Sequence, residues 1–404
     1  MPAGKRASVQ AQMEERNSVK IYFVDGSFKS CPANKFTTME QLWAIASEKL
    51  SFSVKTATNF FIWGVESDLE LLLYADTTLE EIKGSWPQWM NQFSNNTKKR
   101  QKKLSTDFRL VYKPTCIVPL SIERKLSQLE AVNIFFMEAI KNVVSSNYPC
   151  DIDTAVRLGG LQAQAILGDR NPAQHKVGYM QKEIRRFIPE HLHAMKRTEE
   201  WEELIFASHE KNRGQPKNIT KMLYLQQVRQ WKYYGSVFFE ATFTPSSQTF
   251  YNQEFSGIIH VGVNHDGLHF IDPKIMKVVS VEFKDVVKIS SNAFMFGVTQ
   301  RQEDPAAPAR EWIVKTRAGT LIDDLIHDWF AEIRATNNWI EEERVRQTTP
   351  SVSEANSLSS TANNTPTAVR QQQDRMSTAY KPKNHADWEM DEIEAIAAEI
   401  HHSR

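Results

Sequence analysis

The segment WKYYGSVFFEATF, residues 231–243, marks the point where the sequence pattern changes from helical to strand-like. Upstream of it, residues 117–232 place apolar side chains three or four positions apart, the spacing of one face of an α-helix. Beyond Gly235, apolar and polar residues alternate with a period of two, as the two faces of a strand require. This change of period predicts a boundary between a helical unit and a β-rich unit.

The helical unit is predicted from several amphipathic segments. LEAVNIFFMEAIKNVV (129–144) and DTAVRLGGLQAQAIL (153–167) each carry one apolar face, and NITKMLYLQQVRQW (218–231) forms the last helix. Acidic residues follow Thr198, which favours a helix start there because they face the positive end of the helix dipole. Within the second helix, Gly159 and Gly160 are predicted to let helices approach closely. We expect a bundle of four to six helices.

The β-rich unit contains seven strand candidates separated by turn residues. A single predicted helix, residues 320–335, closes the unit with Leu321, Leu325, Trp329 and Ile333 four positions apart. Seven strands and one C-terminal helix predict a pleckstrin- or phosphotyrosine-binding-type β-sandwich. The candidate strands are residues 238–243, 257–263, 267–272, 277–283, 285–290, 293–299 and 311–317.

Residues upstream of 115 predict a third unit. Two strand-like runs meet at Asp25-Gly26, a pair that suits a tight hairpin turn. Thr38 and Gln41 form a capping-box pattern before a helix. Further strands are expected at 60–65, 69–74 and 108–112, with a short turn of helix at 77–82. This order of elements matches a ubiquitin-like β-grasp.

The two ends of the chain differ from these units in composition. Residues 1–17 are polar and predicted as a flexible leader, and residues 338–385 are rich in Ser, Thr, Gln and Asn, which predicts a disordered linker. Residues 386–404 predict an acidic amphipathic helix. We expect this helix either to dock back on the folded units or to remain free or bind another protein. The folded units are assigned to residues 18–114, 115–232 and 233–337.

Composition limits the class of protein. Lys+Arg and Asp+Glu both total 49, so the net charge of +0 argues against a nucleic-acid partner. The three cysteines are far apart, and they fit neither a disulfide framework nor a zinc site. No apolar run has the length of a transmembrane helix, and the first residues lack the features of a secretion signal. We therefore expect a soluble intracellular protein.

Several short motifs occur in a fixed order between residues 155 and 239. Their order and spacing resemble the FERM domains of ezrin, radixin, moesin, talin and certain myosin tails, over residues 18–337. Within the third unit, residues 261–264 and 267–269 are similar to the Krev-interaction-trapped proteins. The motifs are Ala155–Gln164, Gly168-Asp169, Phe187-Ile188-Pro189-Glu190, Trp201-Glu202-Glu203-Leu204-Ile205, His209, Arg213-Gly214, Tyr224-Leu225 and Tyr234-Gly235-Ser236-Val237-Phe238-Phe239.

The resemblance implies an α+β fold with three lobes. These are a ubiquitin-like β-grasp, an α-helical bundle like acyl-CoA-binding protein, and a PH/PTB-like seven-strand β-sandwich with a C-terminal helix. It also implies a cytoplasmic adaptor, peripheral at the plasma membrane or cell cortex, that links membrane phosphoinositides and the cytoplasmic tails of membrane proteins to the cytoskeleton or to signalling complexes.

Motifs of enzymes are absent from the sequence. There is no GxxxxGK[ST], GxGxxG, GxSxG or HExxH pattern. His260, His265 and His269 lie close together in sequence, but no cysteine is near to complete a zinc site, so we interpret them as ordinary strand and turn residues. We expect a non-enzymatic protein without a cofactor or a metal.

A basic run between the last two strands of the first unit is the strongest charge feature. It is either a solvated or nuclear-import-like segment, or a contact for anionic phospholipids, to which each basic residue contributes up to about 1 kcal/mol. A second, less focused basic patch lies at residues 182–197. The residues of the run are Lys98, Lys99, Arg100, Lys102 and Lys103.

The predicted sandwich also offers a peptide site. An extended peptide can add to the edge of the fifth strand, beside the C-terminal helix, through backbone hydrogen bonds. FERM relatives hold receptor tails in this way. Apolar helix residues such as Leu325 and Trp329 are more often core than groove. The candidate groove residues are Val286, Val287, Lys288, Ile289, Ser290, Ser291, Leu325, Asp328, Trp329 and Glu332.

A second function stays open for the first unit. Its β-grasp edge could pair with a Rap- or Ras-like small GTPase, with Lys29 and Lys35 as contact residues. The protein would then be an effector or scaffold for that GTPase.

Overall fold

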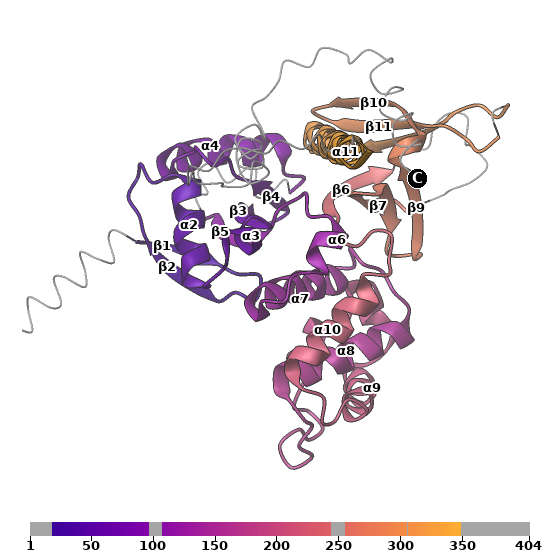
Figure 1. The fold of residues 1–404 in the computed structure, drawn as a ribbon. Coiled ribbons are helices and arrows are strands. Elements are labelled where there is room, and N and C mark those ends of the chain that lie inside the picture. The colour runs from indigo at the N-terminus through magenta and orange to yellow at the C-terminus, as the bar shows by residue number, and fades with distance from the viewer. Residues whose placement is uncertain (1–17, 97–106, 244–254, 305, 349–404) are drawn as a thin grey trace, which may run out of the picture.

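The computed structural model describes residues 18–96, 107–243, 255–304 and 306–348, and within the last helix it places side chains as far as residue 337. These residues form three lobes that meet at one junction (Figure 1). Three predicted segments lie outside the described residues. They are the leader, the acidic helix and the part of the linker from residue 349 to residue 385. No described helix combines the length and the apolar character that crossing a bilayer requires.

The first lobe is a five-stranded sheet packed with helices. The sheet order is β2-β1-β5-β3-β4, and β1 runs parallel to β5. Thr38 and Gln41 form the predicted capping box at the start of α2. This arrangement is the predicted β-grasp. Its elements are β1 Ser18–Tyr22, β2 Phe28–Pro32, α2 Met39–Lys49, α3 Val54–Ala57, β3 Phe60–Glu66, β4 Leu69–Leu72, α4 Leu79–Phe93 and β5 Arg109–Pro114.

Helix α4 differs from the prediction of a short turn at residues 77–82. It continues to Phe93 with Pro87 inside it. Gly84 and Pro87 normally weaken or end a helix, but here the apolar face of the helix prevails. Trp86 is fully buried, stacks on Phe108 at 4.6 Å between ring centroids, and donates a hydrogen bond to Glu66 at 2.8 Å. Tertiary packing therefore extends the helix beyond its local sequence signal.

The second lobe is a bundle of five α-helices with two short 3₁₀ segments. Helix α8 packs against α9 and α10. A Cβ atom added at Gly159 would lie 2.2 Å from Ile205 Cδ1, and one at Gly160 would lie 2.2 Å from Ser208 Oγ. The prediction that these glycines allow close helix approach is confirmed. The elements are α6 Leu120–Glu123, α7 Leu129–Val144, α8 Ile152–Leu167, η1 Ile184–Arg186, η2 Glu190–Met195, α9 Thr198–Glu210 and α10 Lys217–Val228.

The third lobe contains the seven predicted strands and the closing helix. The strands form one continuous ladder, β10-β11-β12-β6-β7-β8-β9, so β9 and β10 are its two edges. Apolar side chains of the strands and of α11 form one core. The elements are β6 Val237–Phe243, β7 Ile258–Asn264, β8 Gly267–Asp272, β9 Lys277–Glu282, η3 Phe283–Asp285, β10 Val286–Asn292, β11 Met295–Gln300, β12 Arg310–Lys315 and α11 Gly319–Thr348.

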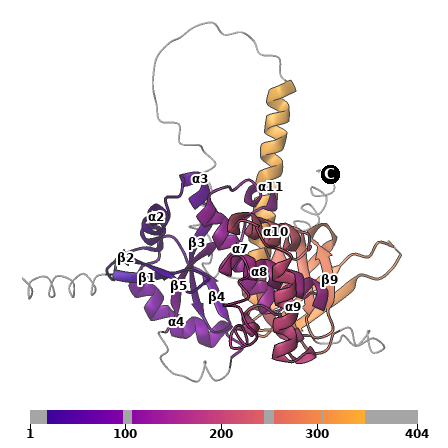
Figure 2. The ribbon, with the colours of Figure 1, turned by 90° about the horizontal axis from the view of Figure 1, so that it is seen from below.

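Helix α11 is longer than predicted. It ends at Thr348, so residues 338–348, predicted as the start of the linker, are helical. Figure 2 shows its last turns extending beyond the body of the molecule. The apolar pattern used for the prediction stops near Ile333, but residues 341–346 are rich in amino acids of high helix propensity, which favours continuation of the helix.

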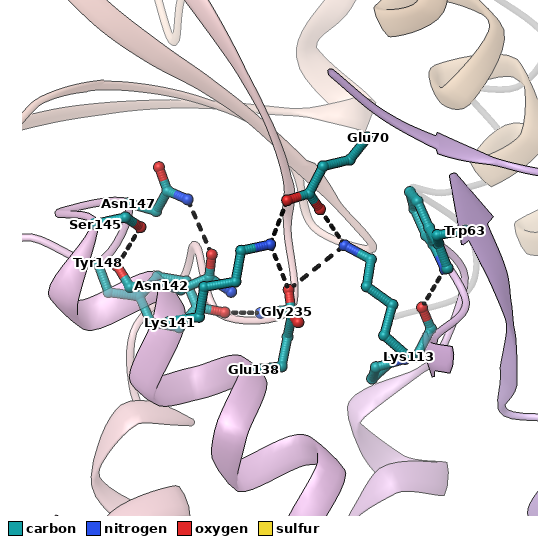
Figure 3. Close-up of polar contacts among 11 residues, drawn as sticks. Trp63, Glu70, Lys113, Glu138, Lys141, Asn142, Ser145, Asn147, Tyr148 and Gly235 are labelled. Atoms are coloured by element: carbon teal, nitrogen blue, oxygen red, sulfur yellow. Dashed lines mark hydrogen bonds and ion pairs between the residues drawn. The ribbon is translucent and has the colours of Figure 1, made fainter. Parts of the chain in front are cut away.

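The first and second lobes are joined by a group of charged side chains, of which Lys113 is buried and Glu70, Glu138 and Lys141 are half-buried (Figure 3). Glu70 of β4 pairs with both Lys113 of β5 and Lys141 of α7, and Glu138 Oε1 lies 3.7 Å from Lys113 Nζ and 3.9 Å from Lys141 Nζ. Burial by itself would raise the pKa of Glu70, but the two lysines outweigh it and hold this pKa below its usual range. Phe60 of β3 packs on Phe135 of α7 beside these charges, with 5.2 Å between ring centroids.

The second and third lobes meet at Tyr148. Its hydroxyl accepts a hydrogen bond of 2.8 Å from the backbone N–H of Gly235. Its ring contacts Trp231, Tyr234 and Phe238, which come just before and after the change of period. Gly235 has a positive φ of 73°, a conformation that glycine adopts at little cost. The tyrosine thus fixes the chain at the point where helix gives way to strand.

The third lobe also contacts the first lobe, so each lobe contacts the other two. In this third contact, a residue of the third lobe caps the end of helix α4 in the first. Arg317 donates from Nε to the carbonyl of Gln92 at 3.0 Å and from Nη2 to the carbonyl of Asn91 at 2.7 Å. Asn95 donates from Nδ2 to the carbonyl of Glu240 at 2.9 Å. The last carbonyls of a helix lack internal partners and attract cations. The end of α4 is therefore stabilised by a residue more than two hundred positions away.

We predict that Glu70→Gln destabilises the protein by about 1–2 kcal/mol, because it leaves two lysines without their shared carboxylate at a half-buried site, where solvent screens part of the loss. Urea unfolding at neutral pH measures this. The matched control is Glu80→Gln, which breaks the exposed Lys35–Glu80 pair at 3.4 Å and should cost less than about 0.5 kcal/mol. Equal costs for the two variants would contradict a structural role for the charges between the first and second lobes.

A second prediction concerns His269, which is 1% exposed and bonded to Ser280 and Asn264. Burial lowers its pKa from 6.5 to about 3. The unfolded chain therefore binds a proton that the folded chain does not, so the stability present above pH 6.5 is lost as the pH falls. Between about pH 6.5 and pH 5, this loss is roughly 2 kcal/mol. His269→Gln should lose less stability over the same range, as measured by urea unfolding.

Candidate functional site

Strand β10 is the edge of the third-lobe sheet beside α11. It pairs with β11 along one side, with a bulge between Val286 and Lys288, and its other side lies next to α11 (Figure 1). Lys288 and Ser290 are exposed, whereas Val287 and Ile289 are half-buried. The strand thus presents one polar face and one apolar face, and its outer edge belongs to no ladder among the described residues.

The helix side of this edge is polar at its start. Ser291 Oγ donates a hydrogen bond to Asp323 Oδ2, and His327 Nδ1 lies 2.8 Å from the backbone carbonyl of Asp323. Burial alone lowers the pKa of His327, but its bonds to Asp323 and the charges of Asp323 and Asp324 outweigh burial and raise this pKa. Sequence reasoning missed Asp323 and His327. Their spacing of four residues on one helix face was the available signal.

The helix residues that the sequence analysis assigned to the groove do not all line the β10 edge. Leu325 is 6% exposed and Trp329 2% exposed, and both belong to the core of the third lobe. The Trp329 ring faces His265 of the β7–β8 turn, with 6.2 Å between ring centroids. Asp328 is close to Cys116, where it adds to burial in raising the pKa of that thiol. Glu332 is half-buried. Of the predicted groove residues, those of β10 thus lie together at the sheet edge, whereas Leu325 and Trp329 are in the core and Asp328 is beside Cys116.

The turn after β10 carries an exposed aromatic residue. Phe294 is 68% exposed, and the Arg317 guanidinium lies 5.6 Å from its ring centroid. Because Arg317 also caps α4, the end of the β10 edge is next to the contact between the first and third lobes. A peptide lying along β10 would reach an aromatic side chain at this end.

The predicted basic run, residues 98–103, lies outside the described residues. The less focused basic patch is described in part. Arg186 is 2.8 Å from Glu183, and Arg197 is 3.0 Å from Glu200. These pairs reduce the positive potential of that patch. Lipid contact through the basic run stays a prediction.

The residues predicted to contact a GTPase lie near the free edge of the first-lobe sheet. Lys29 is exposed on β2, which is the first strand of that sheet. Lys35 lies 3.4 Å from Glu80 and 4.6 Å from the ring centroid of Phe36. Phe28, also on β2, is 46% exposed. The edge therefore carries exposed aromatic side chains as well as lysines.

His260, His265 and His269, the histidines considered as a possible metal cluster, have separate surroundings. His269 is bonded to Ser280 and Asn264, and His265 lies 3.4 Å from Asp266. Within the described part of the chain, no group of three or more His, Cys, Asp or Glu side chains could hold a metal ion.

Comparison with known proteins identifies the fold. The model of the FERM central domain matches residues 121–239. FERM domain-containing protein B of Dictyostelium discoideum is 29% identical, over 78% of this chain and 87% of that protein. Talin-B of the same organism is 32% identical, over 27% of this chain and 4% of its own length.

Solved structures agree with these relatives. The human myosin 7b C-terminal MyTH4-FERM domain, solved with the harmonin-a PDZ3 domain, has a TM-score of 0.59 at 17% identity and covers 78% of this chain and 60% of its own. The first MyTH4-FERM domain of Dictyostelium myosin VII has a TM-score of 0.56 at 15% identity, over 78% of this chain and 60% of its own. The chain thus spans less than two thirds of these myosin structures. The predicted FERM fold is confirmed.

We predict that Trp329 supports the core of the third lobe. Trp329→Ala should destabilise the protein by about 3–5 kcal/mol, because it removes a large buried ring. Phe294→Ala removes an exposed ring and should cost less than about 1 kcal/mol. Thermal and urea unfolding compare the two. A cost near zero for Trp329→Ala would mean that its ring belongs to the groove surface.

Proposed function

We propose that this FERM-fold protein is a non-enzymatic adaptor that holds the cytoplasmic tails of membrane proteins along β10. The observation that carries the proposal is the outer edge of β10 beside α11, which pairs with no strand in the part of the chain that the structure describes. A tail segment added there would gain backbone hydrogen bonds from the strand. Half-buried Val287 and Ile289 would select its apolar side chains, and Asp323 with His327 would select polar ones.

The relatives support an adaptor role. Talin and myosin VII are among the proteins that this chain resembles, and the matched MyTH4-FERM domain of myosin 7b was solved with a protein partner, the harmonin-a PDZ3 domain. We extend this to the present chain as a link between membrane-protein tails and the cortical cytoskeleton or signalling complexes, with the protein peripheral at the plasma membrane.

Anionic phospholipids are the second partner in this proposal. The run Lys98, Lys99, Arg100, Lys102 and Lys103 follows Asn96 at the end of the α4 region. Five basic residues near a phosphoinositide surface could supply a few kcal/mol of salt-sensitive binding. This is enough for weak recruitment, which a bound tail would reinforce because both partners lie at the same membrane.

The proposed tail site is tested with an array of cytoplasmic-tail peptides from membrane proteins. Val287→Lys places a charge beside the β10 edge and should weaken the binding of the captured peptides by about tenfold or more. Val177→Lys makes the same change at a position in the second lobe that is 75% exposed, and should leave binding unchanged. Equal binding by both variants would exclude β10 as the site.

The lipid contact is tested by flotation on vesicles with and without phosphatidylinositol 4,5-bisphosphate. Replacing the five basic residues of the run with alanine should abolish flotation at physiological salt, because the attraction is electrostatic. If this variant floats at high salt as well as the wild type does, the run is not the lipid contact.

A small-GTPase effector is the alternative function. The free edge of β2, with exposed Phe28 and Lys29, favours it, since such edges can pair with a strand of a partner. Pull-down with Rap- or Ras-like proteins loaded with GTP or GDP tests it. Equal retention of both forms, or of neither, would remove this alternative.

A further inference from the structure

A cavity of about 330 Å³ lies at the junction of the three lobes. Its walls come from β3 to β5 of the first lobe, from α7 and the segment after it in the second, and from residues 234–240 and His260 of the third. This volume is within the range of small-molecule sites. Because its lining combines residues of all three lobes, the cavity forms only when the lobes are docked.

The charged residues of the lining are mostly acidic. Most of them are already neutralised, since Glu70 and Glu138 face the two lysines described above and Glu123 lies 2.7 Å from Arg229. The lining contains two lysines, Lys113 and Lys141, and five acids, Asp68, Glu70, Glu123, Glu138 and Glu240. Two of these acids, Asp68 and Glu240, form no ion pair with any residue that the structure describes.

Asp68 and Glu240 come from different lobes, are both exposed to solvent and are held near each other. Asp68 is fixed by hydrogen bonds from Ser94 Oγ at 2.6 Å and from the Asn95 backbone N–H at 2.7 Å. The side chain of the same Asn95 donates to the backbone carbonyl of Glu240 at 2.9 Å. Burial and, after it, the charge of Asp68 raise the pKa of Glu240. A cation placed between the two carboxylates would relieve this repulsion.

The rest of the cavity lining suits the hydrocarbon part of an organic ligand better than a metal ion or an anion. Val118, Phe135, Ala139 and Phe238 contribute apolar surface. Ser236, which is 7% exposed and lies in the same lining, has no hydrogen-bond partner for its hydroxyl among the described residues. An anion would meet two unpaired carboxylates, and no described cluster offers three ligands for a metal.

We propose that the junction cavity binds a small organic cation through an ammonium or guanidinium group placed between Asp68 and Glu240. Its carbon chain lies against the apolar wall. The group can belong to a free di- or polyamine, or to a lysine or arginine side chain of a partner protein. Because Asp68 and Glu240 belong to the first and third lobes, the bound cation strengthens the docking of one lobe on the other.

The test uses the full chain and agmatine, which carries both a guanidinium and an ammonium group. Calorimetry should detect binding, and the thermal unfolding midpoint should rise with agmatine concentration. Glu240→Gln keeps the shape of the side chain and the carbonyl that Asn95 contacts, and it should weaken binding by about tenfold or more. Glu48→Gln, an exposed change on α2 outside the cavity, should leave binding unaltered.

Two further arms support the proposal or overturn it. Lowering the pH to about 5 should weaken agmatine binding to the wild type more than to Glu240→Gln, because the raised pKa of Glu240 makes it take up a proton. A blocked arginine tripeptide separates the two sources of the cation. Binding of this peptide in place of agmatine assigns the site to a partner side chain, and preference for agmatine assigns it to a free amine.

Three results would overturn the proposal. The first is no binding of either probe to the wild type, or equal binding to wild type and Glu240→Gln. The second is tighter binding of inositol hexakisphosphate that Glu240→Gln improves, which would make the cavity an anion site. The third is agmatine binding that arises only after Lys98, Lys99, Arg100, Lys102 and Lys103 are replaced by alanine, because the chain's own basic residues would then be the occupant.

Discussion

Two lysines and two glutamates between the first and second lobes constrain the whole molecule. Lys113 is buried and the other three are half-buried, so removing them partly from water costs free energy that their close pairing offsets. Glu70 can meet both Lys113 and Lys141 only when α7 lies across the first-lobe sheet. Apolar contacts such as Phe60 on Phe135 would tolerate small shifts, but the ion pairs would not. The charges therefore define one relative position of the two lobes.

The other contacts between lobes depend on that position. Helix α7 leads into the segment that carries Tyr148, and Tyr148 holds Gly235 at the start of the third lobe. The third lobe then returns to the first through Arg317, which caps α4. These contacts form a closed ring around the junction cavity. Arg317 also lies 5.6 Å from the ring centroid of Phe294, so the contact that closes this ring is next to the end of the β10 edge.

Much of the fold was predictable from local sequence signals. The change of period at residues 231–243, the seven alternating strands and the capping box at Thr38 and Gln41 are short-range patterns, and the structure contains each of them. The extent of two helices was not. Helix α4 passes through Gly84 and Pro87 because Trp86 is buried by Phe108 and bonded to Glu66. Helix α11 continues past its apolar pattern because residues of high helix propensity follow.

The sequence by itself determined which elements form and in what order, because periodicity and capping act between near neighbours. Tertiary structure alone decided what the site residues do. Leu325, Asp328 and Trp329 share a helix with Asp323 and His327, yet only the packed lobe puts the last two near β10 and the others in the core or beside Cys116. Asp68 and Glu240 are far apart in sequence and carry no motif. They come near each other because the lobes dock. The pKa of Glu240 is raised by burial and by the charge of Asp68, and a linear pattern contains neither of these.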